Sequence, residues 1–261
     1  MFSKAVKDLR GGMGMSHVWL YQAYHDISAK YRRTIFGSLW IVGQMVFMSL
    51  SFAVVYGALF GEDLAKSLPH IMTGIMSFTL IGTYLLSDAP EIYLSNTGII
   101  SNHAYPFTYY NFESITRTLL IFLHNIVVLE IVLLLVRAGT VPHWTLIIGL
   151  AFVIVNMFTW GSVIGMLASR YRDLRFLLPN MAQLIMFVTP VIYDPKQIPA
   201  SKHFIVDFNP IYPFVEMIRS PLLGLAMPMQ YWPMALGVTI AGLIIWFLTF
   251  SAFRSRIAFW V

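Results

Sequence analysis

The chain has 261 residues, of which 58% are hydrophobic and 11% are charged, and its formal net charge is +5. Soluble domains carry about 25% charged residues, so this chain lacks the charge to cover its own surface in water. The composition therefore excludes an ordinary soluble domain and predicts an all-α, polytopic membrane protein.

The first predicted element is an amphipathic helix over residues 16–33, SHVWLYQAYHDISAKYRR. Its apolar and aromatic residues at helical spacing are Val18, Tyr21, Tyr24 and Ile27. Terminal cations beside such a stripe are typical of a helix that lies in the membrane interface. We therefore predict an interface helix on the cytoplasmic leaflet, and the alternative is a flexible tail.

Six segments are candidates for membrane-spanning helices, since a span needs about 20 mostly apolar residues. They cover residues 36–60, 71–87, 118–136, 145–168, 176–192 and 232–253. The second segment is short, and the fifth contains Pro179 and Pro190, which require compensation from neighbouring helices or polar groups. The sequence thus predicts six spans.

Lysine and arginine are distributed unequally between the two ends of these segments. Twelve fall on the side of the chain termini and five on the other side. Because cytoplasmic loops carry an excess of these residues, both termini are predicted to lie in the cytoplasm. The cations stand beside apolar runs along the whole chain, which favours membrane orientation over nucleic-acid binding.

Glu130 is the one acidic residue inside a predicted span, and His124 and Asn125 accompany it. A charge near the membrane centre costs at least about 2.5–3.5 kcal/mol, so this carboxyl group should be protonated, paired or in a wet cavity. Arg137 lies on the same helical face and is a candidate partner. The functional interpretation is a proton or ion relay, and the alternative is a structural contact near the outer end of the helix.

Motifs for catalysis are missing from the sequence. No GxxxxGK[ST] phosphate loop, HExxH or GxSxG motif occurs, there are no cysteines, and the histidines show no metal-ligand spacing. We therefore predict no catalytic site, no metal site and no cofactor in this chain. GALFG (Gly57 to Gly61) and GSVIG (Gly161 to Gly165) fit the small-xxx-small pattern that permits close helix packing.

Four motifs, in order on this six-span frame, resemble the membrane subunit of ABC exporters for cell-surface polysaccharides. KYRRTIFGSLW, just before the first span, is similar to the family's basic pair, aliphatic residue, glycine and tryptophan. NTGIISNHAYPF resembles its asparagine, aliphatic pair and aromatic–proline pattern, and PVIYDPKQIP resembles its proline–aromatic turn. NPIYPFVEMIRSPLLG resembles its asparagine–proline element, which a short helix with an arginine follows. The resemblance runs from about residue 16 to the C-terminus and implies one ABC-2 type transmembrane domain over residues 1–261.

This resemblance implies a permease subunit that exports a lipid-linked glycan, such as O-antigen, capsule or teichoic acid, across the bacterial inner membrane. Two copies of the permease, a homodimer, would pair with two copies of a separate ATPase, which would hold ATP and Mg²⁺. The cytoplasmic loop over residues 88–117 would contain a coupling helix that is seated on the ATPase. Its contact residues would be Ile99, Ile100, Asn102, Tyr105 and Pro106.

The resemblance also implies a substrate entrance at the end of the interface helix. Its residues would be Tyr31, Arg32 and Arg33. Their cations could attract the pyrophosphate of a lipid-linked glycan through charge-assisted hydrogen bonds. The alternative is simple orientation of the chain by lipid headgroups.

Spans one and five would line the channel, as the resemblance implies. Aromatic rings stack on the apolar faces of sugars, and many weak contacts would let a polymer slide. The candidates for this lining are Phe47, Phe52, Tyr56, Phe187 and Tyr193. The alternative for each ring is lipid contact or core packing.

Residues 193–231 are predicted to lie on the extracytoplasmic side and are dense in prolines and aromatic residues. The stretch FNPIYPFVEMIR (208–219) is too short and broken to span a membrane, yet too apolar for an ordinary loop. Since non-helical backbone at membrane depth must be buried in protein or face water, we predict re-entrant short helices here, one of them around 214–223. The residues of this predicted outer gate are Pro210, Pro213, Glu216 and Arg219. Glu216 and Arg219 should pair on one helix face, and the alternative for the segment is an interfacial loop.

Two other functions compete with polysaccharide export. The first is an ABC permease of related architecture for a small molecule, such as a drug or haem. The second is a channel or secondary carrier that works alone. The absence of an internal repeat and the scarcity of charge inside the spans disfavour the carrier.

Overall fold

The computed structural model describes residues 2–32, 34–37, 39–137 and 139–261, and every regular element among them is helical. The longer helices are α1 (Phe2–Gly14), α2 (Ser16–Tyr31), α3 (Leu39–Phe60), α4 (Leu64–Phe78), the π-helix η1 (Thr79–Asp88), α7 (Phe107–Leu135), α8 (Leu146–Arg170), α9 (Leu174–Val188), α11 (Tyr212–Leu222) and α12 (Trp232–Phe253). The short helices are α5 (Glu91–Leu94), α6 (Thr97–Asn102), η2 (Pro195–Gln197), η3 (Ala200–Lys202), α10 (Phe204–Asp207), η4 (Met229–Tyr231), η5 (Arg254–Arg256) and α13 (Ile257–Trp260).

Five helices of the described chain are long and apolar enough to cross a membrane. They are Leu39–Phe60, Leu64–Asp88, Phe107–Leu135, Leu146–Arg170 and Met229–Trp260. α3, α7 and α12 present many apolar side chains outward, as a helix in contact with lipid does, whereas Leu64–Asp88 is largely buried inside the protein. The protein is therefore a multi-pass membrane protein, and five of the six predicted spans correspond to helices of spanning length.

The predicted fifth span corresponds to α9, which has only 15 residues and ends at Val188, four residues before the predicted end. Thr189 adopts an extended conformation (φ −80°, ψ 134°) because it precedes Pro190, and a residue before proline is disfavoured in a helix. A 15-residue helix is about 22 Å long, which is shorter than the hydrocarbon core of about 30 Å. The prediction that this segment spans the membrane alone stays a prediction.

The second and third spans begin earlier than predicted. α4 and η1 run without interruption from Leu64 to Asp88. This helix begins at Leu64 because Asp63 caps its first turn, where the Asp63 carboxylate accepts a hydrogen bond from the Ala65 amide at 3.2 Å. α7 begins at Phe107, so the second half of the predicted loop 88–117 is helical. The reason lies in a distant partner: the Asp8 carboxylate accepts hydrogen bonds from the amides of Phe107 (3.3 Å) and Thr108 (3.0 Å).

The N-terminal region forms two helices, of which α2 confirms the helix predicted over 16–33 and α1 was not predicted. Both pack along α7, and Trp19 of α2 stacks on Phe112 with ring centroids 5.8 Å apart. Within the predicted stripe Ile27 is buried, whereas Tyr21 and Tyr24 are exposed, and the contact of this helix with the membrane stays a prediction. The buried side of α2 instead continues through Ala23, since residues four apart share one helix face.

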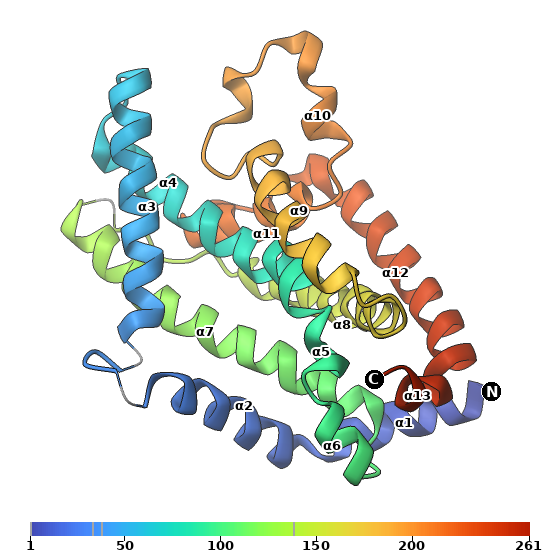
Figure 1. The fold of residues 1–261 in the computed structure, drawn as a ribbon. Helices are drawn as coiled ribbons and strands as arrows, with labels where there is room; N and C mark the ends of the chain where they lie inside the picture. Colours follow the sequence, from blue (N-terminus) through green and yellow to red (C-terminus); the bar gives the residue numbers. More distant parts are fainter. Residues whose placement is uncertain (1, 33, 38, 138) are drawn as a thin grey trace.

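Both chain termini lie at the same end of the helix bundle (Figure 1). α1, α2, α6 and α13 gather at this end, whereas α10 lies at the opposite end (Figure 1). Phe2 stacks on Phe247 of α12 with ring centroids 5.1 Å apart, so α1 is held against the last long helix. This arrangement agrees with termini that share one side of the membrane.

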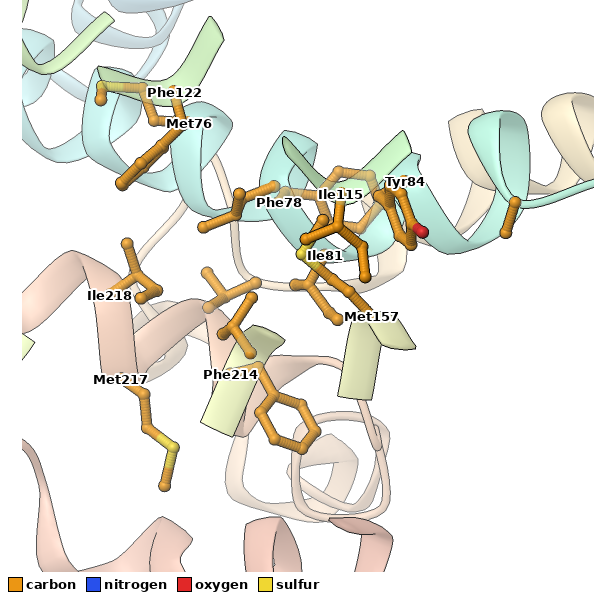
Figure 2. Packing of buried hydrophobic residues seen from close by; sticks show 14 of the residues in the cluster. Met76, Phe78, Ile81, Tyr84, Ile115, Phe122, Met157, Phe214, Met217 and Ile218 are labelled. Atoms are coloured by element: carbon orange, nitrogen blue, oxygen red, sulfur yellow. The ribbon is translucent and has the colours of Figure 1, made fainter. Parts of the chain in front are cut away.

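The core forms around α4 and η1. Figure 2 shows Met76 of this continuous helix near Phe122 of α7, and Ile81 among Ile115 of α7, Met157 of α8 and Phe214 of α11. All of these side chains are buried. The core therefore joins the spanning helices to the short helix α11 that follows α9.

Close helix approaches depend on glycines that lack a Cβ atom. A Cβ on Gly161 would lie 2.9 Å from the Tyr84 ring, and one on Gly165 would lie 3.0 Å from the Ala89 carbonyl oxygen, so the packing predicted for GSVIG is confirmed. GALFG has no such role. A Cβ on Gly57 would meet the backbone of the following turn, and Gly61 has a positive φ of 68° with no atom within 4 Å of its Cβ position.

Gly149→Ala tests this packing at the contact between α8 and α11. An added Cβ would lie 2.2 Å from the Met217 carbonyl oxygen, so backbone must move. We expect a loss of about 1–3 kcal/mol in the free energy of unfolding, measured by SDS titration in mixed micelles. Gly237→Ala in α12 is the matched control, because nothing lies within 4 Å of its Cβ position. An equal loss in both variants would contradict the close approach.

Candidate functional site

The outer segment is organised by Asn209. Its side chain accepts hydrogen bonds from the amides of Ile211 (3.0 Å) and Tyr212 (3.3 Å), and donates one to the Thr189 hydroxyl at 2.8 Å. Asn209 thus starts α11 and attaches its first turn to the end of α9. Pro213 stands in the first turn of α11, where its missing amide N–H has no helical partner to lose. The helix predicted around 214–223 therefore exists but begins earlier, at Tyr212.

A buried ion pair lies at the centre of α11 and confirms the pairing predicted for Glu216 and Arg219. The Arg219 Nε and a Glu216 carboxylate oxygen are 3.4 Å apart, and the Arg219 side chain is only 2% exposed. Arg219 also donates to the Pro190 carbonyl and lies 2.9 Å from Nε2 of His70 in α4. One guanidinium group therefore connects α11 with α4 and with the turn after α9.

Glu216 has further partners within α11. Its carboxylate accepts hydrogen bonds from the hydroxyls of Tyr212 (3.1 Å) and Ser220 (2.8 Å). Burial raises the pKa of Tyr212, and the neighbouring Glu216 carboxylate raises it further, so the hydroxyl keeps its proton and remains a donor. The carboxylate and both hydroxyls of this cluster thus have hydrogen-bond partners, whereas the Arg219 Nε contacts the carboxylate without a hydrogen bond.

α11 is surrounded by protein along its whole length. All eleven of its residues are buried, and it packs against α4 and α8. An interfacial helix exposes one polar face to water, and α11 exposes none. α11 is therefore a buried helix of the protein, and its position relative to the membrane stays a prediction. Pro210 lies just before this helix and is exposed.

Four of the five predicted channel-lining residues share one groove of about 370 Å³. Phe52 and Tyr56 come from α3, Phe187 from the end of α9, and Tyr193 from the turn that follows. The Tyr56 hydroxyl donates a hydrogen bond to Gln197, which fixes the ring at the rim of this aromatic groove. Phe47 lies outside it and is 75% exposed.

The predicted entrance lies at the junction between α2 and α3. Tyr31 is the last residue of α2, and the Thr34 amide and hydroxyl both donate to its carbonyl oxygen, at 3.1 and 2.9 Å. Arg32 follows and is exposed. Arg33 lies outside the described residues. The structure thus places Tyr31 and Arg32 in the segment that leads into α3, the first helix of spanning length.

The predicted coupling residues lie on and after α6, at the end of the bundle that holds the termini (Figure 1). Ile99 and Ile100 are half-buried and pack against the core, so they hold α6 to the protein. Asn102 is exposed, and its amide donates to the Gly98 carbonyl at 2.8 Å. Tyr105 is half-buried with its ring centroid 5.1 Å from that of Tyr109, and Pro106 immediately precedes α7.

Ion pairs connect the helices at this same end, and sequence reasoning did not find them. Arg175 at the start of α9 binds both carboxylate oxygens of Glu91 in α5, at 2.9 and 3.0 Å. Arg117 of α7 contacts Asp26 of α2 at 3.8 Å. The partners lie 84 and 91 residues apart in the chain, so no local pattern could have indicated them.

Glu130 has no ion-pair partner among the described residues, and the expected pair with Arg137 is wrong. One of its carboxyl oxygens is buried without a hydrogen-bond partner in the described part of the chain. Arg137 lies beyond the end of α7 with a positive φ of 55°, which directs its backbone away from the helix. The relay and the structural contact both stay predictions.

Comparison with known proteins places these features in a family. The model of the ABC-2 type transporter family matches residues 23–223. Two curated proteins, both described as the O-antigen export system permease protein RfbA of Klebsiella pneumoniae, are each 22% identical over 213 residues. Each alignment covers 79% of this chain and 80% of the relative. The family match covers most of the chain and agrees with its helical, multi-pass fold, so the protein belongs to the ABC-2 type transporter family.

Proposed function

We propose that this permease exports a lipid-linked cell-surface polysaccharide, of the O-antigen kind, across the bacterial inner membrane. Membership of the family implies an ABC transporter with a partner ATPase, and ATP and Mg²⁺ would bind to that partner. The names of the two relatives support export of an O-antigen. A permease for a drug or haem is the alternative within the family.

The aromatic groove is the feature that favours a polysaccharide over a small molecule as the substrate. Sites for small molecules usually enclose 70–90% of their ligand and orient it with a few polar groups. In this groove Phe187 is 51% exposed, and rings of two helices face a shared open path. Exposed rings offer repeated, weak contacts to the apolar faces of sugars, which suits a polymer that must move along the surface.

The assembly that we propose contains two copies of this chain and two ATPase subunits. The exposed end of α6, with Asn102, would be seated on the ATPase. A movement of α6 would reach α9 through the adjacent α5, since the Glu91–Arg175 pair connects α5 to the start of α9. α9 supplies Phe187 to the aromatic groove, so ATP hydrolysis would change the width of the path.

The membrane placement that we propose has both termini in the cytoplasm. Tyr31, Arg32 and Arg33 would receive the pyrophosphate of the lipid carrier at the cytoplasmic surface, and Pro210, Pro213, Glu216 and Arg219 would belong to the outer gate. The common end of both termini supports this placement (Figure 1). The complete burial of α11 supports a re-entrant helix at the outer end.

Co-purification and export together test this function. The chain is expressed together with a candidate ABC ATPase subunit from the same organism, and the complex is purified in detergent. We expect an ATPase subunit in equal amount, and export of the glycan in cells that lack their own permease. Permease that purifies without any ATPase would refute the transporter assignment. A complex that moves a drug but no glycan would favour the alternative substrate.

A further inference from the structure

A polar cavity of about 740 Å³ lies beside α11, between the segment that contains α10 and the start of α12. Its volume falls within the range of about 300–1,000 Å³ that is typical of ligand sites. The described ionisable residues of its wall are His70, Asp194, Lys196, His203, Asp207, Glu216 and Arg219. We call it the outer chamber.

The outer chamber and the aromatic groove are both adjacent to a third cavity. A smaller cavity of about 280 Å³ lies between them. It shares with the outer chamber His70, Asp194 and Lys196. It shares with the aromatic groove Tyr56, Ile192 and Gln197. The shared residues thus arrange the three cavities in the order aromatic groove, smaller cavity and outer chamber.

The charged residues of the outer chamber determine which ligands it can accept. The wall of the outer chamber holds three carboxylates, and the described cations beside them are Lys196 and Arg219. The guanidinium of Arg219 already contacts Glu216, His70 and the Pro190 carbonyl. A phosphate or carboxylate ligand would therefore find Lys196 as a donor and several like charges nearby, whereas anion sites supply several aligned donors.

The same wall suits a neutral ligand with many hydroxyl groups. Carboxylates accept hydrogen bonds from hydroxyls, and the Lys196 ammonium and the Gln230 amide donate them. Tyr231 adds aromatic surface, and its ring centroid lies 5.1 Å from that of the buried Tyr212. A sugar ring presents both hydroxyl edges and an apolar face, so both kinds of wall residue would be used.

We infer that the outer chamber binds an uncharged, polyhydroxylated segment of the exported glycan and disfavours a polyanionic one. This inference rests on the proposed function and narrows it: the substrate is a neutral polysaccharide rather than a phosphate-rich or acidic polymer. The selection would act after the glycan has passed the aromatic groove.

Two tryptophan variants test the location of the site. Gln230→Trp places a bulky ring in the chamber wall, and Met229→Trp places the same ring on the adjacent residue, which is 80% exposed and outside the wall. The full chain in lipid nanodiscs is titrated with maltoheptaose as a neutral probe, followed by saturation-transfer NMR. We expect Gln230→Trp to weaken binding by about tenfold and Met229→Trp to change it by less than about twofold.

A charge variant tests the selectivity. A glycerol phosphate oligomer of similar length is the anionic probe, and the native chain should bind it at least about tenfold more weakly than maltoheptaose. Asp207→Lys adds a cation at an exposed wall position that makes no side-chain hydrogen bond within the described chain, and should reverse this preference. Equal or tighter binding of the anionic probe by the native chain would overturn the inference. So would an equal effect of the two tryptophan variants.

These measurements need neither ATP nor a partner subunit. If they fail while the chain still co-purifies with its ATPase and exports a glycan, the neutral-glycan site is wrong and the exporter assignment stands. If the ATPase does not associate, the exporter assignment itself is wrong.

Discussion

Arg219→Met is expected to lower the free energy of unfolding by about 3–5 kcal/mol, the cost of breaking a buried ion pair by removing one partner. The arginine is 2% exposed and connects α11 to His70 of α4 and to the Pro190 carbonyl. Without it, the Glu216 carboxylate is left buried beside two hydroxyl donors that cannot neutralise it. SDS titration of the purified permease measures the loss.

A second substitution distinguishes two effects of Arg219→Met: the unpaired buried charge of Glu216 and the lost contacts of Arg219 with α4 and the Pro190 carbonyl. Glu216→Gln in the Arg219→Met background removes the unpaired charge while the side-chain carbonyl still accepts from Tyr212 or Ser220. We expect the double variant to recover part of the stability but not glycan export, because the polar connection from α11 to His70 of α4 and to the Pro190 carbonyl is still missing. Arg219→Lys keeps the positive charge but lacks the planar guanidinium group. Its free energy of unfolding should therefore lie between those of the native chain and Arg219→Met. A double variant less stable than Arg219→Met would contradict the ion-pair explanation.

The long helices follow from local sequence, and their ends follow from it only in part. Segments such as α8 and α12 are more than 20 residues long, mostly apolar and without an acidic residue, and hydropathy alone predicts them. The end of α9 at Val188 was also available from the sequence, because the residue before Pro190 is disfavoured in a helix. The early start of α7 was not, since its cap, Asp8, lies about 100 residues away.

In the candidate site, too, some contacts could be predicted from the local sequence and others depend on the packing of distant segments. Glu216 and Arg219 are three residues apart on one helix, so their contact could be predicted, whereas His70 reaches them only through the packing of α4 on α11. Phe52 and Tyr56 are four residues apart and share a face of α3. Phe47 is rotated by about 140° from Phe52 at about 100° per residue, so the helical period already separates it from the groove. The three outer cavities depend on the course of residues 193–231, for which the sequence offers no periodic pattern.

The cations at the terminal end of the bundle have two roles at once. Their number predicts the orientation of the chain, but the structure also pairs Arg117, Arg175 and Arg254 with carboxylates of other helices. The pairs join α2 to α7, α5 to α9, and α1 to the end of α12. The region that would face the ATPase is thus held together by contacts between segments distant in the chain. A force on one helix there is transmitted to its neighbours.

Asp8→Ala is expected to have the second largest effect on stability and to act on the start of α7. The Asp8 side chain is 1% exposed, accepts hydrogen bonds from the Phe107 and Thr108 amides, and pairs with Arg254 at 2.8 Å. Its removal eliminates hydrogen bonds to a charged group, each of which contributes about 1.5–3 kcal/mol to stability. It also eliminates a helix cap, which contributes about 1 kcal/mol. We expect a loss of about 3 kcal/mol in the free energy of unfolding, and faster amide hydrogen exchange in the first turn of α7.

Asp8→Asn is the matched control, because the amide oxygen can still accept from the first turn of α7 while the charge toward Arg254 is lost. It should retain the slow exchange of that turn and lose only part of the stability. Arg254 is 25% exposed, so water compensates part of its lost pairing. If Asp8→Ala left the exchange of residues 107–110 unchanged, the cap would not be what starts α7. A helix start inside protein needs an acceptor within hydrogen-bond reach of its free amides, and at the start of α7 the Asp8 carboxylate is such an acceptor.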